Sequence, residues 1–191
     1  TLLHEPEKDL WALDMPDAAY AAQLHGFAWM DDLAAVGDAA TRETAQRWLW
    51  GWIEAYGRGR GPGWTPDLTG RRLIRWINHA IFVLRGMESE DSHRFYRSLV
   101  QQTQFLSRRW RGAAPGLPRF EALTGLIYAG LSLEGQEALA GPAIKAIAWI
   151  MAGLGVVVAF YQWYEYTELL LRAGEEAADL HGGRIRRCAE S

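Results

Sequence analysis

The stretch GWTPDLTGRRLIRWINHA, residues 63–80, passes from a Gly/Pro turn into an amphipathic helix. Pro66 suits the first turn of a helix, because an N–H at that position would have no intrahelical partner. The apolar residues that follow are spaced by 3, 1, 3 and 4 positions, which places them on one stripe: Leu73, Trp76, Ile77, Ala80 and Leu84. This spacing predicts a helix from near Pro66 to Gly86 with one face in a core.

The segments upstream of this stretch also carry helix signals. A helix is predicted over 16–37, with Asp14 or Asp17 available as its cap, and a second helix begins after the cap Asp38. The second helix ends at GRGRGPG, residues 57–63, because four glycines and one proline cannot continue it. Short glycine-rich breaks of this kind predict consecutive helices that fold back on each other.

Three further helices are predicted downstream of Gly86. They run from about 91 to 111, from about 120 to 133 and from about 136 onward, with Pro142 as a kink in the last. No segment shows sustained alternation of apolar and polar residues, so no sheet is expected. Helices joined by short loops predict an all-α array of antiparallel helical hairpins.

Length and composition place the chain among globular proteins with one sizeable core. It has 191 residues, 49% of them hydrophobic, and its net charge of −3 gives no indication of a nucleic-acid partner. The one cysteine, Cys188, cannot form an internal disulfide, and the five histidines show no metal-ligand spacing, so no metal or cofactor is predicted. No signal peptide is visible, and a cytoplasmic or membrane-associated location is expected.

The segment AIAWIMAGLGVVVAFYQWY, residues 146–164, contains no charged residue. Its nineteen residues are close to the roughly 20 that span a bilayer. Aromatic residues gather at its end, as they do at a membrane interface: Tyr161, Trp163, Tyr164 and Tyr166. The alternative is a fully buried core helix. The predicted organisation is a helical domain over 1–145, a long apolar helix over 146–180 and a basic tail over 181–191.

Asn78 and His79 are candidate catalytic residues near the end of the helix predicted from Pro66. On one helical turn, an amide can neutralise a substrate carboxylate while an imidazole accepts a proton. The alternative is a surface or core histidine whose ring is simply hydrogen-bonded.

Aromatic and basic residues of the same stretch are candidate ligands of an acidic glycan. A guanidinium group fits carboxylates and sulfates with two parallel hydrogen bonds, and a tryptophan ring can stack on a sugar. The candidate substrate-binding set is Trp64, Arg71, Arg72, Arg75 and Trp76. The alternative is that the arginines pair with acidic neighbours or stay solvated, and that the tryptophans pack in the core.

Five stretches, within about residues 10–148, together resemble the N-terminal helical region of bacterial heparinase II/III-like proteins. They are WMDDLAAVGD (29–38), W-x-W-x-W-I (48–53), GWTPDLTGRRLIRWINHA (63–80), FYRSLVQQTQFLSRRWR (95–111) and LPRFEALTGLIYAGLSLEG (117–135). The resemblance implies a partial α/α toroid. Members of this family pair the toroid with a β-sandwich and cleave uronic-acid glycans by β-elimination. Their Asn, His and Tyr lie in the toroid cleft, and the sandwich contributes a further His.

The C-terminal region departs from the pattern of this family. Residues 146–165 do not match, and no counterpart of the Asn turn, the Tyr or the sandwich His is identified. We therefore expect an acidic-polysaccharide-binding helical domain with an incomplete catalytic set, and whether it is an enzyme stays open. The expected substrate side comprises Trp64, Arg71, Arg72, Trp76 and His79. The second hypothesis is a structural or assembly subunit that docks to a membrane or membrane complex through 146–166.

Overall fold

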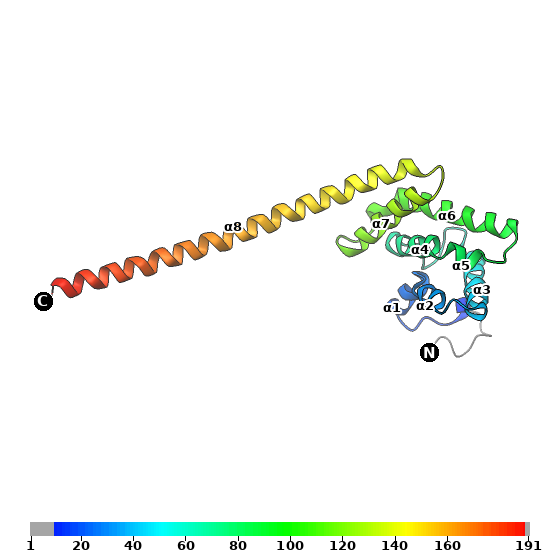
Figure 1. The fold of residues 1–191 in the computed structure, drawn as a ribbon, viewed down its shortest axis with the longest axis horizontal. Helices are drawn as coiled ribbons and strands as arrows, with labels where there is room; N and C mark the ends of the chain where they lie inside the picture. Colours follow the sequence, from blue (N-terminus) through cyan, green and yellow to red (C-terminus); the bar gives the residue numbers. More distant parts are fainter. Residues whose placement is uncertain (1–9, 190–191) are drawn as a thin grey trace. The chain divides into compact units, whose positions relative to one another are not determined.

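The computed structural model describes residues 10–189, and of Tyr166 and residues 168–189 it describes only the backbone. Every element of regular structure in this range is a helix (Figure 1). The predicted all-α fold with a long apolar C-terminal helix is therefore confirmed. The chain divides into two compact units, which meet in the sequence between Ile147 and Ala148, slightly after the predicted boundary at 145.

The elements follow one another through short connections, as the glycine-rich breaks predict. In chain order they are η2 (Leu10–Ala12), α1 (Ala18–His25), α2 (Ala28–Val36), α3 (Ala39–Tyr56), α4 (Pro66–Asn78), α5 (Ala80–Leu84), α6 (Ser89–Arg109), η3 (Trp110–Gly112), α7 (Leu117–Ser132) and α8 (Glu137–Ala189).

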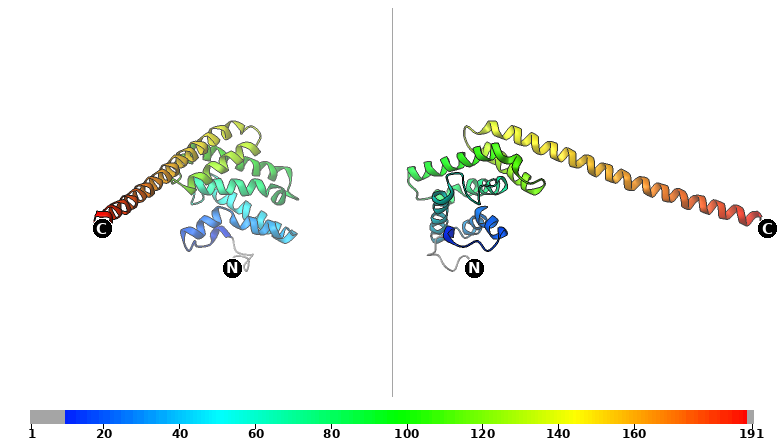
Figure 2. Two further views of the ribbon diagram at one scale, coloured as in Figure 1. Left: turned by 60° about the vertical axis from the view of Figure 1, so that its left-hand side comes forward. Right: turned by 180° about the vertical axis from the view of Figure 1, so that it is seen from behind.

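Helix α4 occupies the centre of the first unit. It packs most extensively against α7 and also contacts α6, α1 and α2, so it lies between two groups of helices (Figure 1, Figure 2). Fully buried rings meet the indole of Trp76: its centroid lies 5.2 Å from Phe27, 5.6 Å from Trp52 and 5.4 Å from Phe95. Aromatic pairs of this kind add about 1 kcal/mol each beyond the burial of their area. The stripe that predicts α4 therefore faces an aromatic core.

Helices α4 and α7 cross in backbone contact at two glycines. A Cβ atom built on Gly125 of α7 would lie 2.3 Å from the Gly70 Cα and 2.6 Å from the Gly70 carbonyl oxygen. A Cβ atom on Gly70 would lie 2.3 Å from the carbonyl oxygen of Glu121. The close crossing depends on glycine at both positions, and it places α7 directly beside α4.

Helices α1, α3 and α4 begin close to the residues that the sequence predicts at their starts. Asp17 caps α1, because its carboxylate accepts a hydrogen bond from the Tyr20 N–H at 2.7 Å. Asp38 caps α3 in the same way, accepting from the Thr41 N–H at 2.8 Å. Pro66 lies in the first turn of α4, as predicted.

The first predicted helix is not continuous. It divides at Gly26 and Phe27, and Phe27 adopts a left-handed conformation, with φ of 61°, that is uncommon outside glycine. Two arginines of α4 bind the carbonyl groups at the break: Arg72 donates to the His25 oxygen at 3.0 Å and Arg75 to the Gly26 oxygen at 2.8 Å. Hydrogen bonds from these distant arginines stabilise the break, although the local sequence favours a continuous helix.

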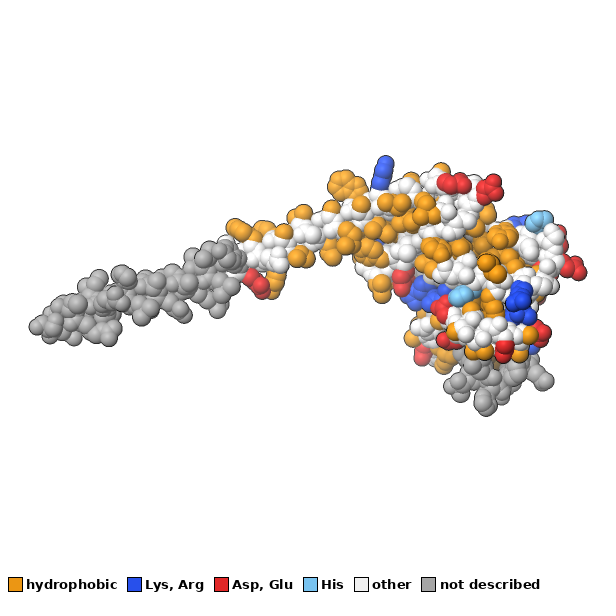
Figure 3. All heavy atoms as spheres, in the orientation of Figure 1, with side chains coloured by type: hydrophobic (Ala, Val, Ile, Leu, Met, Phe, Trp, Pro, Cys, Tyr) orange, Lys and Arg blue, Asp and Glu red, His pale blue; other side chains and the backbone are white. Residues whose placement is uncertain are grey.

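Helix α8 begins at Glu137, close to the start predicted near 136, and Pro142 lies inside it. Its backbone stays helical through Gly182 and Gly183, where an end was predicted, and through the predicted basic tail to Ala189. Residues 190–191 of that tail lie outside the described residues. Apolar side chains cover the described part of this helix in the second unit, residues 148–165, on the face shown in Figure 3.

Candidate functional site

A break between α4 and α5 places the two candidate catalytic residues. Helix α4 ends at Asn78, the backbone of His79 has φ of −103° and ψ of 14°, and α5 begins at Ala80. The His79 N–H still donates to the Arg75 carbonyl oxygen at 3.0 Å, so the chain turns at a single residue. The prediction of one continuous helix from Pro66 to Gly86 is therefore wrong. The break occurs because Asn78 and His79 bind partners on two different helices.

Asp31 of α2 holds both His79 and Arg75. One carboxylate oxygen lies 2.9 Å from His79 Nε2, and the other accepts a hydrogen bond from Arg75 Nε at 2.7 Å. Partial burial by itself would raise the pKa of Asp31, but the hydrogen bonds from Arg75 and His79 lower the pKa below its usual value. Asp31 is therefore an anion at neutral pH, and it can only accept a hydrogen bond from the imidazole.

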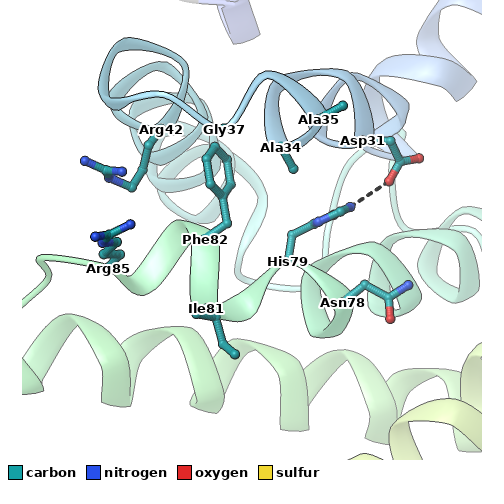
Figure 4. Close-up of a pocket in the computed structure, with 10 residues that line it drawn as sticks. All are labelled: Asp31, Ala34, Ala35, Gly37, Arg42, Asn78, His79, Ile81, Phe82 and Arg85. Atoms are coloured by element: carbon teal, nitrogen blue, oxygen red, sulfur yellow. Dashed lines mark hydrogen bonds and ion pairs between the residues drawn. The ribbon is translucent and has the colours of Figure 1, made fainter.

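His79 lines an open pocket of about 510 Å³ in the first unit (Figure 4). The walls come from α2, the start of α3 and the α4–α5 segment, and Asp31 and Asn78 lie on the same side of the pocket as His79 (Figure 4). The remaining lining residues are Ala34, Ala35, Gly37, Arg42, Ile81, Phe82 and Arg85. The pocket therefore combines polar groups at one end with an aromatic wall and two arginines at the other.

The contact with Asp31 fixes the proton on His79 in the neutral imidazole. Because Nε2 donates to the carboxylate, Nδ1 keeps a lone pair that can accept a proton. A carboxylate that orients a histidine is the arrangement found in general-base catalysis. The pocket lining contains no Ser, Thr or Cys, so the arrangement offers a base without an adjacent hydroxyl or thiol nucleophile.

Asn78 binds a residue of α7 that the sequence pattern does not identify. The hydroxyl of Tyr128 donates a hydrogen bond to Asn78 Oδ1. The signal for Tyr128 is weak but present, because it is a phenol in a helix that is otherwise almost entirely apolar. Asp31 was also missed, although it stands in an acidic pair within the apolar stretch FAWMDDLAAV, residues 27–36. The structure thus brings Asn78 together with Tyr128 and His79 together with Asp31.

Two members of the predicted substrate-binding set belong to the core. Arg72 and Trp76 are 0% exposed, so neither side chain can contact a glycan on the surface of this structure. Their physical role is different: Trp76 lies at the centre of the aromatic core, and Arg72 stacks 4.1 Å above the ring of Trp52. The placement of these two residues on a substrate side is corrected accordingly.

The other three members of the set are partly exposed but already have partners. Trp64 donates its indole N–H to the Tyr56 carbonyl oxygen at 2.7 Å. Arg71 lies 2.8 Å from a carboxylate oxygen of Glu121, and Arg75 is held by Asp31. None of these three residues lines the pocket that contains His79 and Asn78.

The predicted membrane-interface residues lie on α8. Tyr161, Trp163 and Tyr164 are all more than half exposed. The side chain of Tyr166 lies outside the described residues. Within 10–165 and 167, the structure contains no group of three or more His, Cys, Asp or Glu side chains placed to hold a metal ion.

Comparison with protein families, with curated proteins and with solved structures found no match to this chain. The function of the chain is therefore inferred from the geometry of the pocket at His79 and from the properties of α8.

Proposed function

We propose that this chain is a membrane-docked helical domain that is held at the bilayer by the apolar part of α8. One observation carries the proposal. The described residues contain one helix, Glu137–Glu165, that is long and apolar enough to cross a membrane, and only 6% of its most apolar window is buried in protein. A soluble protein uses such a segment as a core helix, and this one has no core around it.

The exposed side chains of this segment are large. Trp149 is 78% exposed, Val156 is 70% exposed and Phe160 is 66% exposed. Water contact with apolar surface costs about 25 cal/mol per Å², so a row of such side chains is stable only in an apolar surrounding. The hydrocarbon core of a bilayer provides that surrounding.

The dimensions and the ends of the segment fit a bilayer. Nineteen residues from Ala146 to Tyr164 form a helix about 28 Å long at 1.5 Å per residue, and the hydrocarbon core is about 30 Å thick. Lys145 precedes the segment and Glu165 follows it, so charges stand only at its two ends. Tyr161 and Trp163 lie near the second end, where aromatic rings suit the interface.

Replacing Leu154 with arginine is expected to release the chain from membranes. Leu154 lies near the middle of the segment, where an arginine costs about 3 kcal/mol, or on the order of a hundredfold in partitioning. The measurement is flotation of the full chain with phosphatidylcholine vesicles. The matched control is Leu117→Arg, because Leu117 is 68% exposed in the first unit. Wild-type and Leu117→Arg chains should float, and Leu154→Arg should not. A wild-type chain that is monodisperse without detergent and does not float contradicts the proposal.

A second candidate function, binding of an acidic glycan, is favoured by the pocket at His79. Asn78, His79 and Asp31 offer hydrogen-bond donors and acceptors at one end of a pocket that is large enough for a sugar ring. The resemblance to heparinase II/III-like proteins supplies the ligand class. With His79 as a base and no further acid or base assigned, we propose binding with little or no lyase turnover.

Replacing His79 with glutamine is expected to weaken glycan binding by about fivefold, because one hydrogen bond to a ligand contributes about 1 kcal/mol. The measurement is calorimetric titration of the full chain in nonionic detergent with heparan-type and alginate-type oligosaccharides, alongside absorbance of the unsaturated uronate product. His93→Gln is the control, since His93 is exposed on α6 and does not line the pocket. Absence of binding contradicts this candidate, and clear turnover contradicts the incomplete catalytic set.

A further inference from the structure

Two arginines lie at the end of the pocket that is remote from Asp31. Arg42 comes from α3 and Arg85 follows α5, and both guanidinium groups lie beyond the ring of Phe82 on the side away from His79 (Figure 4). Neither arginine forms an ion pair with any residue that the structure describes. Two positive charges from distant parts of the sequence therefore share one end of a pocket.

Two hydrogen bonds from Gln46 fix the backbone of Arg85 relative to α3. Gln46 lies one helical turn after Arg42, and its side-chain amide donates to the Val83 carbonyl oxygen at 2.9 Å and to the Arg85 carbonyl oxygen at 3.2 Å. Val83 is 1% exposed, so this end of α5 is anchored in the core. The proximity of the two arginines is thus set by the fold and does not depend on flexible loops alone.

The acidic side chains near the pocket form hydrogen bonds with other residues and do not neutralise Arg42 or Arg85. Asp31 lies at the opposite end and is held by Arg75 and His79. The charge of Arg42 acts on Asp38, but the Asp38 carboxylate accepts hydrogen bonds from the Thr41 N–H and hydroxyl and forms no ion pair with Arg42. Two positive charges at one site repel each other, and an anion bound between them offsets this repulsion because it attracts both.

We propose that Arg42 and Arg85 form a binding site for a dianionic oxyanion, namely phosphate or sulfate. A guanidinium group presents a planar fork of N–H donors that can bind two oxygens of a phosphate or sulfate ion. Two guanidinium groups together carry a charge of about +2, which balances the charge of the dianion. The ring of Phe82 lies beside the two guanidinium groups and offers an apolar surface for an organic part of the ligand (Figure 4). This inference goes beyond both proposed functions and depends on neither of them.

The test is titration of the full chain in nonionic detergent with inorganic phosphate and inorganic sulfate at constant ionic strength. Arg42→Gln and Arg85→Gln are each expected to weaken binding at least tenfold. Arg60→Gln, at an exposed loop arginine outside the pocket, should leave binding unchanged. Gln46→Leu keeps both charges but removes the anchor of Arg85, and it should weaken binding several-fold. Far-UV circular dichroism checks that each variant is folded.

Titration with phenyl phosphate distinguishes a free anion from a phosphate group on a larger molecule. Phenyl phosphate that binds at least tenfold more tightly than inorganic phosphate assigns the site to a phosphate on a larger molecule. Equal affinities assign it to the free anion, and either result supports the site. The proposal is overturned if acetate and chloride compete as well as phosphate does, or if Arg60→Gln weakens binding as much as the two pocket variants. Glycan binding is measured separately, so its failure leaves this result intact.

Discussion

Replacing Gly125 with alanine is expected to lower the free energy of unfolding of the first unit by about 3 kcal/mol or more. The added methyl group would lie 2.3 Å from the Gly70 Cα and 2.6 Å from its carbonyl oxygen. These are backbone atoms of α4, so no side-chain rotation can relieve the overlap. The two helices must separate, and the contact between α4 and α7 is the most extensive in the unit. The same separation would pull Tyr128 away from Asn78.

The measurement is urea unfolding of the full chain in nonionic detergent, followed by the near-UV signal of its tryptophans. Gly141→Ala is the matched control, because Gly141 is also helical and an added Cβ there would meet nothing within 4 Å. Gly141→Ala should change the free energy of unfolding by less than about 1 kcal/mol, because the gain from removing a helical glycine is offset by the restriction that Pro142 places on a preceding residue with a Cβ. Gly70→Ala should behave like Gly125→Ala, since its Cβ would lie 2.3 Å from the Glu121 carbonyl oxygen. Equal midpoints for Gly125→Ala and Gly141→Ala would refute the backbone crossing.

Local chemistry made the helix starts predictable from the sequence. Asp17 and Asp38 cap helices because their carboxylates reach N–H groups three residues ahead, within the same turn. Pro66 suits the first turn of α4 because it has no N–H that would need a partner, and the glycines and proline of GRGRGPG end α3; both signals are also local. The all-α class follows from such signals, since each depends on only a few neighbouring residues.

The two helix breaks could not be predicted, because their causes lie far away in the sequence. The break at Phe27 is stabilised by guanidinium groups from α4, which bind carbonyls 47 and 49 residues away. The break at His79 accompanies a hydrogen bond to Asp31, 48 residues away. No local pattern contains these contacts, and the apolar stripe continues through both breaks.

The sequence predicts two of the four residues of the candidate site. Asn78 and His79 were identified because a titratable ring beside an amide stands out on an otherwise apolar and basic helix. Their partners Asp31 and Tyr128 come from α2 and α7, and only the packing of those helices on α4 brings them near. The set predicted to bind substrate failed at Arg72 for a related reason, because a guanidinium group is ordinarily expected at the surface.

Arg72 provides the one charge among the buried residues that the structure describes, since His25 beside it is neutral. Burial and the charge of Arg72 lower the pKa of His25 to about 4, and His25 Nδ1 accepts from the Trp52 indole N–H at 3.2 Å. Burial also lowers the pKa of Arg72 to about 9, so Arg72 stays charged at neutral pH. Without a carboxylate partner, its charge is stabilised by oxygen acceptors and by aromatic faces.

Four acceptors converge on this guanidinium group, three of them from segments other than α4. Nε donates to Gln102 Oε1 at 2.6 Å, and Nη1 donates to the His25 carbonyl at 3.0 Å and to the Gly63 carbonyl at 2.9 Å. Nη2 donates to the Thr69 hydroxyl oxygen at 3.3 Å. Arg72 therefore joins α6, the end of α1 and the loop before α4.

Replacing Arg72 with methionine is expected to lower the free energy of unfolding by about 4 kcal/mol. Methionine fills much of the volume but leaves buried oxygens without donors, and each such oxygen costs about 1–3 kcal/mol. The measurement is urea unfolding of the full chain, with Arg71→Met as the matched control. Arg71 is the next residue and is partly exposed, so loss of its ion pair with Glu121 should cost less than about 1 kcal/mol. Arg72→Lys should not restore stability, because one ammonium group cannot reach acceptors on three segments. If the two methionine variants unfold at the same urea concentration, Arg72 does not hold these segments together.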